Sequence, residues 1–63
     1  MIIRVNVGKH IARAERGDDG WWTIETRTNG LLARRWKMTA KEDADVFASM
    51  AVALQRLVEE GPK

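Results

Sequence analysis

Hydrophobic and polar residues alternate along the first half of the chain, and the spacing becomes helical in the second half. Alternation with a period of two, rich in β-branched and aromatic residues, predicts strands separated by turns that contain Gly, Asp and Asn. The expected strands cover residues 2–7, 10–16, 21–28 and 31–38. The pattern predicts an α+β fold, in which an antiparallel meander of three strands, or four if residues 2–7 join it, is followed by one helix packed on one sheet face.

The register of the second hairpin depends on the turn at Asn29-Gly30. A two-residue turn would pair Thr28 with Leu31, whereas a three-residue turn with Gly30 in a bulge would pair Arg27 with Leu31. We favour the three-residue turn because it gives one cleaner apolar face. That face would hold Trp22, Ile24, Thr26, Leu32, Arg34, Trp36 and Met38, and the opposite face Trp21, Thr23, Glu25, Arg27, Leu31, Ala33, Arg35 and Lys37.

The segment Thr39-Ala40-Lys41-Glu42 has the spacing of a capping box, with Thr at the cap and Glu three residues later. We therefore expect a helix over about residues 40–60, ending at Gly61-Pro62. We expect Trp22 and Trp36 to be buried beneath the helix and Trp21 to be exposed. The apolar stripe expected to cover the sheet consists of Phe47, Met50, Leu54 and Leu57.

The helix is apolar beyond that stripe, because residues 46–54 carry no charge. A helix that is apolar around most of its circumference is usually buried on more than one side. A chain of 63 residues is too small to do this alone, and it has no cysteine for a disulfide. We therefore expect a homo-oligomer. The expected oligomer interface consists of Val46, Met50, Val52, Ala53 and Val58.

Charge is divided unevenly between the two parts of the chain. Residues 1–38 hold eight Lys or Arg against four Asp or Glu, and residues 39–63 hold three against five. The division fits either two oppositely charged layers that attract each other or an anion-binding sheet face. Arginine binds phosphates by charge and guanine edges bidentately, which favours nucleic acid as the ligand. An ordinary solvated sheet face also carries charges, and Glu15 and Glu25 weaken the positive potential of this one. The candidate nucleic-acid contacts are Arg13, Trp21, Arg27, Arg35 and Lys37.

No pattern indicates catalysis, a metal, a cofactor or a membrane. The single histidine, His10, has no cluster to complete a zinc site, and Asp18-Asp19 between glycines are turn formers. No nucleophile–base pair stands out, so we expect neither an enzyme nor a cofactor. The longest uncharged apolar-rich run, residues 46–54, is far short of the ~20 residues that span a bilayer, and no signal-peptide pattern opens the chain. The lack of cysteine fits a cytoplasmic protein.

Three segments in order, G-W-W-T-I-E, R-R-W-K-M and T-A-K-E-D-A, resemble the plant APETALA-type DNA-binding domain and are similar to the arm-binding N-terminal domains of phage integrases. In both families three antiparallel strands pack on one helix, and the sheet reads the major groove. The Thr-x-x-Glu-x-Ala-like helix start of these families is matched by Thr39, Glu42 and Ala44. The resemblance covers roughly residues 10–60, and it departs in the first strand, which is arginine-rich in the plant family but is interrupted here by Ile11, Ala12 and Ala14. It implies contact with duplex DNA through Arg13, Trp21, Arg27, Arg35 and Lys37.

A second hypothesis is a protein-interaction module. The apolar helix and residues 2–7 could each join a partner chain, by helix packing or by strand addition. Small cysteine-free chains of this kind occur as accessory proteins of phages or mobile elements that bind a host protein. Two hypotheses therefore follow from the sequence: a small DNA-binding accessory protein that uses a basic, tryptophan-bearing sheet face, and a module that dimerises or binds a host protein.

Overall fold

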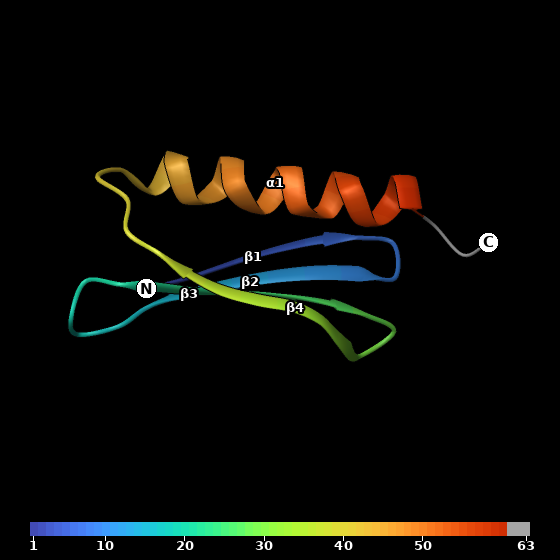
Figure 1. The fold of residues 1–63 in the computed structure, drawn as a ribbon, viewed down its shortest axis with the longest axis horizontal. Helices are drawn as coiled ribbons and strands as arrows, with labels where there is room; N and C mark the ends of the chain where they lie inside the picture. The colour runs from blue at the N-terminus through green and yellow to red at the C-terminus, as the bar shows by residue number, and fades with distance from the viewer. Residues whose placement is uncertain (61–63) are drawn as a thin grey trace.

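The computed structural model describes residues 1–60, which form a four-stranded antiparallel sheet and one helix. Each strand pairs with its neighbour in sequence, and Figure 1 shows the helix as a second layer along one face of the sheet. The α+β fold is confirmed, with residues 2–7 as the fourth strand. The predicted helix end at Gly61-Pro62 lies outside the described residues. The elements are β1 (Ile2–Val7), β2 (His10–Arg16), β3 (Trp22–Thr28), β4 (Leu31–Met38) and α1 (Asp43–Glu60).

A two-residue turn connects β3 to β4. Asn29 and Gly30 both have positive φ, 52° and 81°, which is the signature of a type I′ turn. This turn matches the right-handed twist of the two strands, and it pairs Thr28 with Leu31. The three-residue turn expected from the sequence is therefore wrong.

A β-bulge in β4 nevertheless restores the predicted apolar face. Arg27 faces Leu32 but Thr26 faces Arg34, so Ala33 is the extra residue on β4. Residues that face each other across antiparallel strands lie on the same side of the sheet. Trp22 and Trp36 therefore lie on one side of the sheet with Ile24 and Met38, as predicted, through the pairs Ile24 with Trp36 and Trp22 with Met38.

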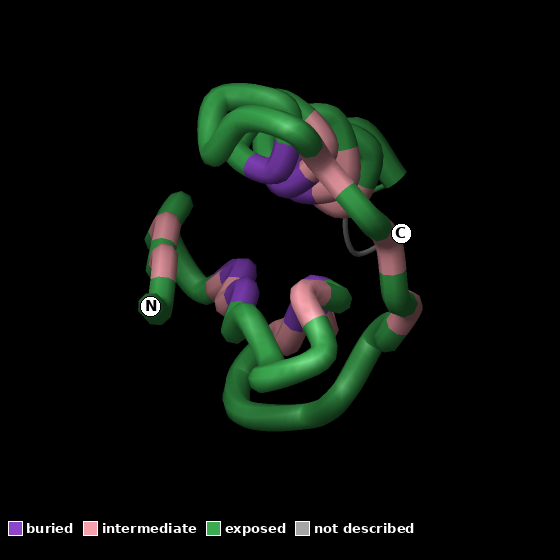
Figure 2. The backbone as a smooth tube through the Cα atoms, turned by 90° about the vertical axis from the view of Figure 1, so that its left-hand side faces the viewer, coloured by how far each residue is buried: buried purple, intermediate pink, exposed green. Residues whose placement is uncertain are grey.

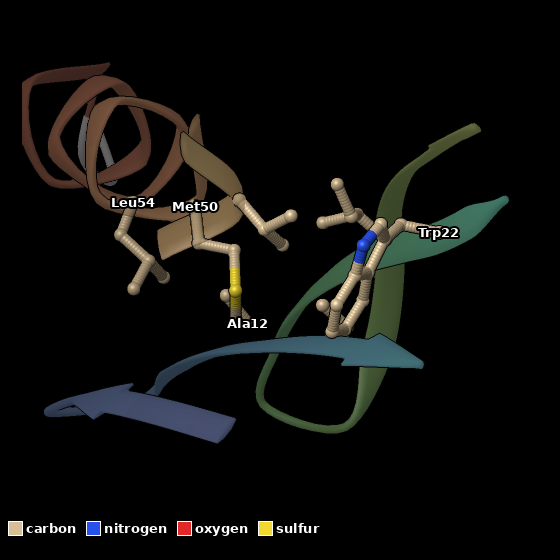
Figure 3. Packing of buried hydrophobic residues seen from close by; sticks show 7 residues of the cluster. Ala12, Trp22, Met50 and Leu54 are labelled. Atoms are coloured by element: carbon tan, nitrogen blue, oxygen red, sulfur yellow. The ribbon is translucent and has the colours of Figure 1, made fainter. Parts of the chain in front are cut away.

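The core lies between α1 and the middle of the sheet. Ala12 and Ala14 of β2 are fully buried, and their small side chains let the helix lie directly over this strand. Figure 3 shows Met50 and Leu54 pointing from α1 toward Ala12, with Trp22 beside them. Figure 2, turned by 90°, shows the buried segments of the two layers facing each other. The buried residues of α1 are Val46, Met50 and Leu54. They are four residues apart, so they lie in one stripe along the helix.

The buried stripe of α1 differs from the predicted one. Phe47 is 50% exposed, because it follows Val46 and so points about 100° away from it around the helix. Val46 and Met50 are fully buried within the single chain, which removes both from the expected oligomer interface. The helix packs on β1, β2 and β3 but does not reach β4. Trp36 on β4 is therefore only partly buried, whereas we expected full burial.

The helix begins three residues later than the capping box predicts, at Asp43. The carbonyl oxygen of Glu42 accepts a hydrogen bond from the Asp45 backbone N–H at an N···O distance of 3.1 Å. Residues 39–42 carry the chain from the sheet layer to the helix layer in Figure 1, so Thr39 comes too early to cap the helix. Asp43 and Asp45 still occupy the first turn, where the helix dipole favours acidic side chains.

The two neighbouring tryptophans should contribute very differently to stability. Trp22 is 2% exposed, and Trp22→Ala should lower the free energy of unfolding by about 3–5 kcal/mol. Trp21 is 45% exposed, and Trp21→Ala should lower it by no more than about 1 kcal/mol. Urea denaturation followed by far-UV circular dichroism measures both values. Equal losses from the two substitutions would contradict the observed register of β3.

Candidate nucleic-acid interface

The sheet face turned away from α1 is not covered by any element of residues 1–60 (Figure 1). We call this side the outer face, and the strand register assigns one set of alternate residues to it. Five cationic and two acidic side chains give the outer face a net charge of +3. Its members are Ile2, Arg4, Asn6, Ile11, Arg13, Glu15, Thr23, Glu25, Arg27, Leu32, Arg35 and Lys37.

One row of outer-face side chains crosses all four strands. The register aligns Arg4, Arg13, Glu25 and Arg35, one residue from each strand. Because neighbouring strands lie ~4.8 Å apart, this row is about 14 Å long. The major groove of B-DNA is about 12 Å wide. Arg4 and Arg35, at the two ends of the row, are therefore far enough apart to reach phosphates on both sides of such a groove.

Two arginines hold the carboxylate of Glu25. Its Oε2 accepts a hydrogen bond from Arg35 Nη2 at 3.2 Å, and its Oε1 accepts one from Arg27 Nε at 3.3 Å. The hydrogen bond from Arg35, assisted by Arg27, lowers the pKa of Glu25, although partial burial acts in the opposite direction. The carboxylate therefore stays ionised near neutral pH and fixes the orientation of two guanidinium groups on the outer face.

A shallow cavity of about 270 Å³ lies beside this cluster, and Arg4, Arg13 and Arg27 line it with Asn6, Ile11 and Glu25. Arg4 and Arg13 face each other directly across β1 and β2, an arrangement in which like charges repel. Arg13 lies 3.5 Å from the carboxylate of Glu15, whereas Arg4 makes no ion pair within residues 1–60. An anion between the two guanidinium groups would remove the repulsion, and phosphate oxygens suit this geometry.

The structure brings four of the five predicted contact residues onto the outer face, namely Arg13, Arg27, Arg35 and Lys37. Trp21 lies just before β3, where its backbone N–H donates to Asp19 Oδ1 at 3.0 Å. Sequence reasoning missed Arg4, although the alternation of residues 2–7 already places it on the polar side. Leu32 lies on the outer face and Leu31 on the other, which reverses their expected positions because the turn has two residues.

The three exposed or half-exposed residues of the expected oligomer interface do not form one surface. Val52 and Ala53 line a groove of about 410 Å³ between α1 and β4, whose opposite wall is Trp36. The guanidinium carbon of Arg34 lies 5.1 Å from the centre of the Trp36 ring, which is cation–π distance. Val58 instead lines a separate apolar groove of about 420 Å³ between α1 and β1.

The remaining candidates for chemistry have structural roles. His10 is buried, and its Nδ1 lies 2.9 Å from Thr28 Oγ1 across the β2–β3 pairing, which satisfies a polar group inside the fold. Within residues 1–60 no three His, Cys, Asp or Glu side chains cluster in a way that could hold a metal ion. The helix of this part of the chain is not apolar enough over its length to cross a membrane.

No protein-family model, curated protein or solved structure matched this chain. The resemblance to sheet-and-helix DNA-binding domains remains a prediction from the sequence pattern. The geometry and charge of the outer face are the features of the molecule that indicate a function.

The pKa of Glu25 should depend on Arg35. The pKa of Glu25 is lower in the folded state than in the unfolded state. The stability that this carboxylate contributes is therefore complete above its unfolded-state pKa. It is lost as the pH falls below about 4 and through the lowered folded-state value. Arg35→Ala should raise the pKa of Glu25 toward its ordinary value and make unfolding less sensitive to acid. Lys37→Ala, on the same strand and face, should leave the pKa unchanged. An NMR titration of the Glu25 side-chain carboxyl decides, and identical pKa values in both variants would contradict the role of Arg35.

Proposed function

We propose that the protein binds duplex DNA through the outer face of its sheet. The observation that carries this proposal is the cross-sheet row. Arg4 and Arg13 oppose each other in it, Arg4 has no carboxylate partner within residues 1–60, and Arg35 stands at the far end. Phosphate contacts supply most of the affinity in non-specific DNA binding. A face with a net charge of +3 and a cation on each of its four strands suits such contacts.

The cluster around Glu25 favours binding with little loss of entropy. Arg27 and Arg35 are held by one carboxylate, and Arg27 also donates to the Gly30 carbonyl oxygen at 3.2 Å. Side chains that are already oriented pay less ordering cost when they meet a ligand. Arg13 and Arg27, from the two central strands, are the side chains that would reach base edges, where arginine recognises guanine.

Trp21 lies at the end of the sheet and is 45% exposed. An exposed indole beside a basic face can stack on a base or wedge against sugar edges. We therefore expect the fluorescence of Trp21 to change when duplex DNA binds. The buried Trp22 should not respond directly, so a Trp21→Phe variant should lose most of the change.

The decisive comparison uses two double variants with the same net charge. Arg4→Gln/Lys37→Gln removes two cations from the outer face, whereas Lys41→Gln/Arg56→Gln removes two exposed cations from the helix side of the molecule. The first should weaken binding to a labelled random duplex at low salt by about tenfold or more, and it should reduce the salt slope by about 2. The second should change both quantities little. Fluorescence anisotropy over a range of salt concentrations measures affinity and slope.

Two results would contradict the proposal. Equal losses in the two double variants would mean that net charge, not the outer face, attracts DNA. No binding of the unmodified protein at tens of micromolar would exclude DNA as the ligand, and recovery of a specific protein in a pull-down would then support the protein-interaction hypothesis. Near-UV circular dichroism of the tryptophans checks that every variant is folded.

A further inference from the structure

The two edges of the sheet differ in how readily they can accept another strand. β4 carries a bulge and three cations, Arg34, Arg35 and Lys37, and such features discourage edge-to-edge pairing. β1 pairs regularly with β2, contains no proline, and carries one charge, Arg4. β1 is therefore the edge that is open to pairing.

The hydrogen-bond phase of β1 identifies its free backbone groups. The Met1 carbonyl oxygen accepts a hydrogen bond from the Arg16 backbone N–H at 3.1 Å, so these two residues form a hydrogen-bonded pair. Hydrogen-bonded and non-hydrogen-bonded pairs alternate along an antiparallel ladder. The odd-numbered residues of β1 therefore bond to β2, and the free edge presents the backbone groups of Ile2, Arg4 and Asn6.

We propose that a second copy of this chain pairs along this edge, β1 against β1, about a two-fold axis at Val5. In this register Arg4 of each copy faces Asn6 of the other, and both residues have the outward backbone groups that the pair requires. On the side of the helix Val5 faces its own counterpart, and Ile3 faces Val7. The adjacent register about Arg4 would place two arginines against each other, which is unfavourable.

One flank of α1 is apolar and exposed beside this edge. Ala51, Leu54 and Val58 line the groove of about 420 Å³ together with Val5, Val7, Gln55 and Glu59. Phe47 precedes Ala51 by one helical turn and extends the same flank. Phe47 is 50% and Val58 49% exposed, so the groove has an apolar margin with nothing in residues 1–60 covering it.

The second copy fits this groove. Because α1 lies over β2, the two helices would lie three strand spacings apart, about 14 Å, and a helix with its side chains is about 10–12 Å wide. That leaves about 2–4 Å between the two helices, a gap that a long side chain on these flanks, such as Phe47, can bridge above the seam. The two-fold axis passes through Val5, which lines the groove together with Ala51 and Leu54. The two helices would run antiparallel across this axis, so Phe47 of one copy would lie near Val58 of the other.

The dimer pairs β1 edge to edge and leaves the outer face uncovered. It does not depend on DNA binding, so the two proposals can fail separately.

A single-cysteine experiment tests the register, since the chain has no cysteine of its own. In the proposed dimer the two Val5 Cα atoms would lie about 4.5 Å apart, within the range that a disulfide spans. Val5→Cys should therefore form a covalent dimer on mild oxidation, seen on a non-reducing gel. Ile3→Cys, on the same strand and side, should not, because its two copies would be about 14 Å apart along the strands. Equal cross-linking of the two variants, or none, would overturn the register.

A second comparison tests the helix flank. Sedimentation equilibrium of the unmodified protein should give twice the 7.2 kDa mass of one chain. Phe47→Lys should give a folded monomer, whereas Val52→Lys, an equally exposed position on the opposite flank of α1, should remain a dimer. Asn6→Pro should also give a monomer, because it removes an N–H that points to the free edge. A monomeric unmodified protein at 100 μM, or a dimer that Val52→Lys breaks and Phe47→Lys does not, would overturn the proposal.

Discussion

The close contact between α1 and β2 organises the rest of the structure. Ala12 and Ala14 carry nothing beyond Cβ, so the helix lies directly on this strand and inserts Val46, Met50 and Leu54 between its neighbours. Packing at this density gives the core its stability and fixes which sheet face is buried. Successive side chains of a strand point to opposite faces of the sheet. The contact that buries the alanines therefore directs the arginines at neighbouring positions to the other face. Core packing and the basic outer face are thus two results of one alternation.

Much of the fold could be predicted because its signals are local. The strands follow from alternation and from turn residues, and the structure agrees with the predicted limits except for Trp21. The bulge at Ala33 has no local signal, because it reconciles a type I′ turn with the apolar faces of two strands that meet only in the folded sheet. Thr39 and Glu42 have the spacing of a capping box, but residues 39–42 connect the sheet to the helix layer and are not helical. The buried stripe of α1 was misassigned at Phe47 because the small residues of β2 decide how the helix sits.

The candidate site was predictable as a face but not as an arrangement. Alternation alone placed Arg13, Arg27, Arg35 and Lys37 together, whereas the importance of Arg4 depends on its pairing with Arg13. Glu25 illustrates the same limit. Counted as a charge it weakens the basic field, but in the structure its carboxylate receives two guanidinium groups and positions them. Pairing across strands, which charge counting ignores, decides what each of these side chains can do.

The order of the strands also has a kinetic consequence. Each strand pairs only with the next one along the chain, and the connection between β3 and β4 is as short as a hairpin allows. Closing such small loops costs little chain entropy, and proteins dominated by contacts between nearby residues fold quickly. The docking of α1 onto β2 joins segments that are farther apart in the chain. We therefore expect the hairpins to assemble early and the arrival of the helix, which closes the core, to set the rate at which the native state appears.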